Sequence, residues 1–235
     1  MNKIQPFCVV AVLLTTASFS TAQTLITDPT RTFTVNQVIN DPQDPPQLFL
    51  QTITDSDIAS LTEVDIGLNL VGTPVDNGFA SDMFVSINQN LSLTGILLNR
   101  VGITDSDSTG FFYDGWNVTF SPTATGGDIH LVNTGDGTGI LTGNYQPDGR
   151  VNPTDTTGTE GLDVFDGSTG NGDWRLAVGD LSSGGQMELD SWSITLTGFT
   201  AVPEPSTLAL TGLGGLWFVA WRKVSGKKNK AQSAI

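Results

Sequence analysis

Apolar and polar side chains alternate one by one through much of the chain between residues 60 and 198. The alternating apolar positions are Val64, Ile66, Leu68 and Leu70; Met83, Val85 and Ile87; Trp116, Val118 and Phe120; Trp174, Leu176 and Val178; and Trp192, Ile194 and Leu196. An apolar residue at every second position places one face of a β-strand on a core and the other in water. Glycine and Asp-Gly pairs separate these stretches, and no segment keeps a helical period. The pattern predicts an all-β fold, a sandwich or jelly roll, over residues 60–198.

Residues 23–59 show a weaker pattern. Asp41-Pro42 and Asp44-Pro45-Pro46 interrupt this stretch, and residues 32–38 form its one strand-like run. We expect residues 23–59 to be an N-terminal extension that leads into the sandwich.

The first 22 residues have the layout of a secretory signal peptide. Lys3 supplies a positive start, residues 6–19 are largely apolar, and Ser20-Thr21-Ala22 offers the small residues that a signal peptidase accepts. The alternative is a membrane anchor, but the apolar run is short and no charged stop follows it. We therefore expect export and removal of residues 1–22.

A second apolar stretch lies near the other end of the chain. Residues 206–221 carry no charge, and Arg222-Lys223 follow at once as a stop-transfer signal. A helix of this length spans about 24 Å, less than the roughly 30 Å of a bilayer core, so the pattern favours a temporary span. Just before it, Val202-Pro203-Glu204-Pro205 holds the chain extended and away from helix.

This order of Val-Pro-Glu-Pro, short apolar helix and basic tail over residues 202–230 closely resembles the PEP-CTERM sorting signal. That signal occurs in exported proteins of Gram-negative bacteria that make exopolysaccharide. The resemblance implies recognition by an exosortase, a membrane-embedded cysteine peptidase or transpeptidase, and removal of the tail after transient anchoring by the helix at 206–221. It places the product in the cell envelope, on the outer surface or in the extracellular matrix.

Charge is distributed unevenly along the chain. Residues 23–201 contain four arginines, no lysine and 23 carboxylates, a formal charge of −19. Such a surface repels phosphate backbones, which excludes nucleic acid as a partner.

The inventory of reactive side chains is small. Cys8 is the one cysteine and lies in the leader, so thiol chemistry is excluded from the remainder of the chain. His130 is the one histidine, in the strand-like run 128–132, where we expect it on the solvent face opposite Ile129 and Leu131. A histidine so placed is not a catalytic base, and the sequence predicts that the protein is not an enzyme.

Two stretches are candidates for binding. Asp105 and Asp107, with Asp114 nearby, offer the hard oxygen ligands that calcium prefers, although Asp and Ser also favour turns without any metal. Phe111-Phe112-Tyr113, in a glycine-flanked loop, is a candidate for an exposed aromatic contact.

A second resemblance covers roughly residues 60–198. It rests on residues 143–149 (GNYQPDG), 162–167 (LDVFDG), 171–180 (NGDWRLAVGD) and 189–196 (LDSWSITL), with 113–122 upstream. These resemble the P domain (Homo B) of subtilisin-like proprotein convertases, in which Trp174, Asp180 and Trp192 would hold structural motif positions. The resemblance implies a galactose-binding-like jelly roll that stabilises a protease domain and does not itself cleave. One departure is Asp105 after Ile103-Thr104, where the family often has a histidine.

Together these patterns predict an exported, non-catalytic module that binds extracellular polysaccharide or a surface protein. One alternative is a protease-associated P domain that acts in trans with a subtilisin-like serine endopeptidase. The other is a surface protein that keeps its C-terminal helix as a permanent membrane anchor.

Overall fold

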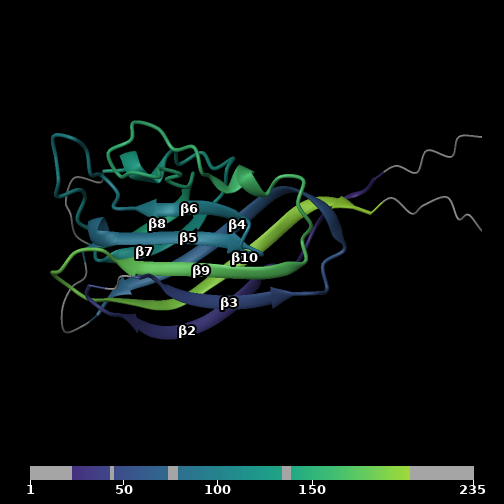
Figure 1. Ribbon diagram of the computed structural model, residues 1–235, viewed down its shortest axis with the longest axis horizontal. Coiled ribbons are helices and arrows are strands. Elements are labelled where there is room, and N and C mark those ends of the chain that lie inside the picture. The colour runs from purple at the N-terminus through teal and green to yellow at the C-terminus, as the bar shows by residue number, and fades with distance from the viewer. Residues whose placement is uncertain (1–22, 43–44, 74–78, 134–138, 202–235) are drawn as a thin grey trace, which may run out of the picture. The chain divides into compact units, whose positions relative to one another are not determined.

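The structure, a computed structural model, describes residues 23–42, 45–73, 79–133 and 139–201. Within these ranges the fold is all-β, with two sheets packed face to face (Figure 1). The strands are β1 (Leu25–Thr27), β2 (Arg31–Ile39), β3 (Gln47–Ile53), β4 (Ile58–Gly72), β5 (Met83–Gln89), β6 (Leu93–Asn99), β7 (Gly115–Phe120), β8 (Ile140–Tyr145), β9 (Gly172–Asp180) and β10 (Met187–Thr200). Three short 3-10 helices join them: η1 (Ala80–Asp82), η2 (Ile129–Leu131) and η3 (Leu162–Phe165). The predicted β-sandwich is confirmed.

The larger sheet has six strands in the order β1-β10-β4-β7-β8, with β2 also paired to β10. The long strands β4 and β10 form its centre and pair antiparallel along nearly their whole length. On the other side of β10, β2 pairs with residues 187–194 and β1 with residues 197–199. The two therefore follow one another along the same edge.

The smaller sheet has the order β3-β9-β5-β6, and all of its neighbours are antiparallel. Its outer strand β3 belongs to the stretch that the sequence predicted to be an extension. Residues 23–59 in fact supply β1, β2 and β3 to the two sheets, so the sandwich begins near residue 25. The sequence signal was weak because strands at a sheet edge bury less of their surface: Leu48 and Leu50 of β3 are 64% and 50% exposed.

The inner faces of both sheets meet in one apolar core. Trp116, Trp174 and Trp192, each predicted to pack inward, are buried. Each of them pairs with a further aromatic ring: the centroids lie 5.1 Å apart for Trp174 and Phe165, 4.7 Å for Trp192 and Phe33, and 6.5 Å for Trp116 and Tyr113. Such pairs add packing energy beyond the apolar area that they bury. The core residues that the structure describes lie between Ile26 and Leu196.

No helix in the described ranges is long and apolar enough to cross a membrane. The predicted signal peptide at 1–22 and the predicted apolar helix at 206–221 both lie outside the described residues.

Candidate functional site

A shallow hollow of about 150 Å³ opens on the outer face of the six-stranded sheet. Two cross-strand rows of polar residues form it. In the first, Ser193 lies opposite Thr32 on one side and Gly67 on the other, and Gly67 lies opposite Thr119. The second row runs beside it, from Ser191 through Asn69 to Asn117.

Gly67 creates the depression. A Cβ added there would lie 2.3 Å from the Ser193 hydroxyl oxygen, so any side chain at this position would fill the space between the strands. None of the ten residues that line the hollow is charged, and their polar groups are hydroxyls and side-chain amides. Groups of this kind donate to and accept from sugar hydroxyls as readily as from water.

A carboxylate borders the hollow. Asp190 accepts a hydrogen bond of 3.0 Å from the side-chain amide of Asn69. With 23 carboxylates and four arginines in residues 23–201, an anionic polymer would meet repulsion on approach. The hollow is therefore suited to an uncharged, hydroxyl-rich ligand.

His130 lies elsewhere than its sequence pattern indicated. It was expected on the solvent face of a strand, whereas the structure places it in η2 with an exposed fraction of 3%. The local reason is Asp128, whose side chain accepts from the His130 backbone N–H and so caps a short helix where a strand was predicted.

Both ring nitrogens of His130 are occupied. Nδ1 lies 2.8 Å from the Asp148 carboxylate, and Nε2 lies 3.0 Å from the Ile103 carbonyl oxygen. Arg150 bonds the same Asp148 carboxylate at 3.1 Å and reaches the partly exposed Asp128 at 2.7 Å, which completes a largely buried network of two acids and two bases. Burial works against the charged imidazolium, but the hydrogen bond and negative charge of Asp148 outweigh it, so the pKa of His130 is raised.

A second buried acid lies at the C-terminal end of β9. Asp180, one of the predicted structural motif positions, is 1% exposed and receives one long hydrogen bond of 3.4 Å from the Ser182 N–H. Burial is the main cause that raises its pKa to about 7; the Ser182 bond opposes the shift, and the charges of Asp41 and Asp82 add to it.

The three residues predicted to bind calcium do not come together. Asp107 accepts from the backbone and hydroxyl of Thr109, and Asp114 accepts from the Gly139 N–H at 2.8 Å. Among the described residues, no group of three or more carboxylate, histidine or cysteine side chains is arranged to hold a metal. Asp107 therefore has the local turn-forming role, and Asp114 links two loops that are 25 positions apart along the chain.

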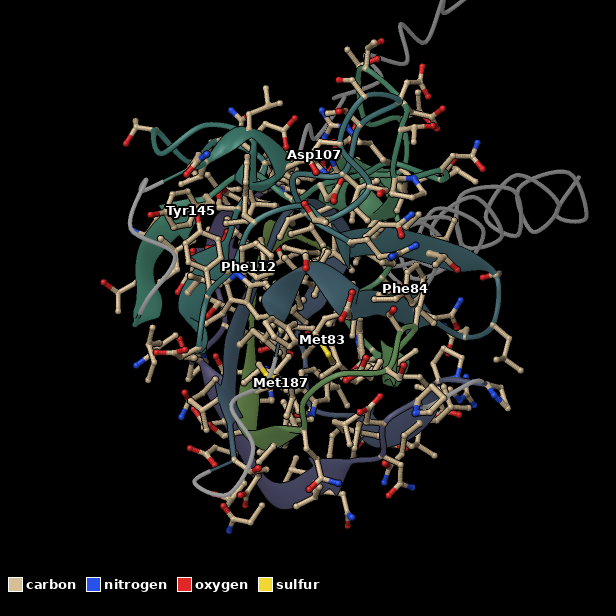
Figure 2. All side chains as sticks on the ribbon, turned by 90° about the vertical axis from the view of Figure 1, so that its left-hand side faces the viewer. Met83, Phe84, Asp107, Phe112, Tyr145 and Met187 are labelled. Atoms are coloured by element: carbon tan, nitrogen blue, oxygen red, sulfur yellow. The ribbon has the colours of Figure 1, made fainter. Side chains whose placement is uncertain are left out.

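The residues of the aromatic loop at 111–113 differ in how exposed their side chains are. Tyr113 is buried, and its hydroxyl donates to the Val132 carbonyl. Phe112 is 45% exposed and meets Phe79 edge to face, with ring centroids 5.5 Å apart. Figure 2 looks onto the end of the molecule that carries Phe112 and Asp107.

At the C-terminus, the family model of the PEP-CTERM protein-sorting motif matches residues 201–224. The chain carries a PEP-CTERM sorting motif. The motif directs export and envelope anchoring by a C-terminal signal that an exosortase processes, as predicted from Val202-Pro203-Glu204-Pro205 and the basic pair Arg222-Lys223. These residues themselves lie outside the described ranges.

Comparisons with whole proteins give less information about function than the sorting motif does. No curated protein matches the chain. Among solved structures, a serine protease of Aeromonas sobria is similar, with 16% sequence identity over 77% of this chain and a TM-score of 0.43. The chain spans 28% of that protease's length, and the likeness is too distant to assign an activity. The resemblance to the P domain stays a prediction.

Proposed function

We propose that the protein is an exported, non-catalytic module of the Gram-negative cell surface or extracellular matrix, and that it binds neutral polysaccharide through the hollow at Gly67. The observation that carries the binding half is the pair of uncharged hydroxyl and amide rows that cross the six-stranded sheet. The sorting motif supports the other half, because it implies export and anchoring in the cell envelope.

The state of His130 supports the absence of catalysis. A general base needs a ring nitrogen free to take a proton from a nucleophile. Here Asp148 and the Ile103 carbonyl occupy both nitrogens, and the ring is buried. The imidazole acts as a cross-link between loops.

The test is a titration of the 23–201 domain, whose strands and core lie within those bounds, with a soluble neutral glucan and with anionic alginate. We expect saturable binding to the glucan and none to alginate. The double variant Asn117→Ala/Ser193→Ala removes two groups of the hollow and should weaken binding about tenfold or more, at about 1 kcal/mol for each lost hydrogen bond. Thr154→Ala, which removes an exposed hydroxyl from another loop, is the matched control.

Two further arms separate the alternatives. A calcium chelator should leave binding to the glucan unchanged. Loss of binding would instead support the calcium site that the sequence predicted at Asp105, Asp107 and Asp114. The intact mass of the product from the native host should lack residues 206–235, and a mass that retains them would favour the permanent anchor. Absence of glucan binding would overturn the polysaccharide proposal and make a surface protein, including a subtilisin-like protease in trans, the next ligand to test.

A further inference from the structure

The edges of the two sheets differ in how well they are protected against pairing with another strand. In the smaller sheet, the free side of β6 is covered by the segment that follows β8. The Ile96 N–H donates to the Glu160 carbonyl at 2.7 Å, and the N–H groups of Asp148 and Gly149 donate back to Leu97 and Ile96. This edge offers few free backbone groups to a partner.

The edge formed by β2 in the larger sheet is interrupted. Asn36 has a φ of +52°, and the pairing of β2 with β10 shifts register between Leu189 and Ser191. A bulge of this kind twists an edge and impairs its pairing with another chain.

Strand β3 has no such protection. Its seven residues pair with β9 in one unbroken register, without a bulge. No other backbone hydrogen bond of residues 47–53 occurs within the described part of the chain. The strand carries no charge, and Leu48 and Leu50 are 64% and 50% exposed on the same outer face. A regular, uncharged, apolar edge is the type that accepts another strand.

The sequence of β3 indicates what that strand is. Residues 47–51 read Gln-Leu-Phe-Leu-Gln, a palindrome centred on Phe49. When two copies pair antiparallel about a two-fold axis at Phe49, Leu48 lies opposite Leu50 of the other copy and Gln47 lies opposite Gln51. Each contact is then made twice, as a two-fold interface requires. We propose that β3 is a homodimer interface that joins two four-stranded sheets into one continuous sheet.

The negative charge of the domain restricts self-association to an uncharged surface such as β3. Two domains of formal charge −19 repel one another, and an interface between them must avoid facing carboxylates. An uncharged strand meets that condition, while leucine pairs and glutamine amides supply the attraction. The dimer would carry two Gly67 hollows, which increases the avidity for a repeating polymer without any new contact to it.

Light scattering of the 23–201 domain over a concentration series tests the oligomeric state. We expect twice the monomer mass for the wild type and the monomer mass for Leu48→Lys/Leu50→Lys. Both positions are exposed, so the melting temperature of the monomer should not change. Leu91→Lys/Leu131→Lys introduces the same charge at positions 74% and 67% exposed outside β3 and should remain dimeric. A monomeric wild type, or a dimer that survives the β3 lysines, would overturn the proposal.

A cross-linking experiment tests the register. Residues 23–201 contain no cysteine, so introduced thiols have no competitors. Directly opposed residues have Cα atoms about 4.5–5.5 Å apart, within disulfide range, whereas diagonal neighbours lie about 7–8 Å apart and beyond it. A mixture of the Leu48→Cys and Leu50→Cys proteins should therefore form a disulfide-linked dimer on oxidation. Either variant oxidised alone should form little disulfide-linked dimer. Stronger cross-linking of either variant alone would refute the palindromic pairing.

Discussion

Asp180 is a buried carboxyl group whose ionisation should make the stability of the fold depend strongly on pH. The side chain is 1% exposed at the end of β9, with one long hydrogen bond from Ser182, and its pKa is raised from 3.8 to about 7. A carboxyl group in such a site stays protonated in the folded protein at a pH where the unfolded chain has already ionised. Asp180→Asn replaces it with a neutral group of the same shape.

The sign of the effect follows from proton linkage. Between the unfolded pKa of 3.8 and the folded pKa of about 7, the folded state binds more protons, so stability falls as pH rises through that window and levels off above it. A shift of about three units corresponds to a loss on the order of 4 kcal/mol. The variant does not incur this loss, so we expect it to be more stable than the wild type by about 2–4 kcal/mol near pH 8. Near pH 5 the difference should be smaller, about 2 kcal/mol, and it should approach zero only near pH 3, where the carboxyl is protonated in the unfolded chain as well.

Urea unfolding followed by the fluorescence of the buried tryptophans measures the difference at each pH. Asp105→Asn, on an exposed loop, is the control and should shift stability little at any pH. A stability difference that does not change with pH, or an Asp180→Asn variant less stable than the wild type at pH 8, would show that burial does not hold this carboxyl neutral.

Two further predictions rest on the packing of buried side chains, and a third rests on the sorting motif. His130→Ala should lower the free energy of unfolding by about 3 kcal/mol near pH 6, because it leaves the buried Asp148 and Arg150 network incomplete. Since the pKa of His130 is raised above 6.5, its contribution is present in full below that value and is lost as pH rises through the folded pKa, so urea titrations should show the difference in unfolding free energy between wild type and variant narrowing as pH rises above 6.5. Trp174→Ala should cost about 3–5 kcal/mol by calorimetry, through the cavity that it leaves against Phe165; a cost near zero would contradict the packing of these two rings. In the native host, replacing Pro203-Glu204-Pro205 with three alanines should block processing, so that mass spectrometry finds residues 206–235 still attached.

Much of the fold could be predicted from alternation alone. The five alternating stretches became β4, β5, β7, β9 and β10, because a strand with one face on the core and one in water must carry that pattern. Strand β6 was not predicted, since Ile96, Leu97 and Leu98 are all buried under η3 and the segment after β8. A strand covered on both faces does not alternate, although its short apolar run was a signal that could have been used.

The candidate sites also differ in how far the sequence alone predicts them. The sorting motif is recognised as a short linear segment, so its residues were determined by the sequence alone. The environment of His130 was not, because Asp148 and Ile103 lie 18 and 27 positions away along the chain. Likewise, the hollow at Gly67 exists because Thr32, Ser193 and Thr119 come from three other strands. Local patterns determine which face of a strand is apolar, whereas the pairing of distant strands decides which polar groups meet, and only the tertiary structure sets that register.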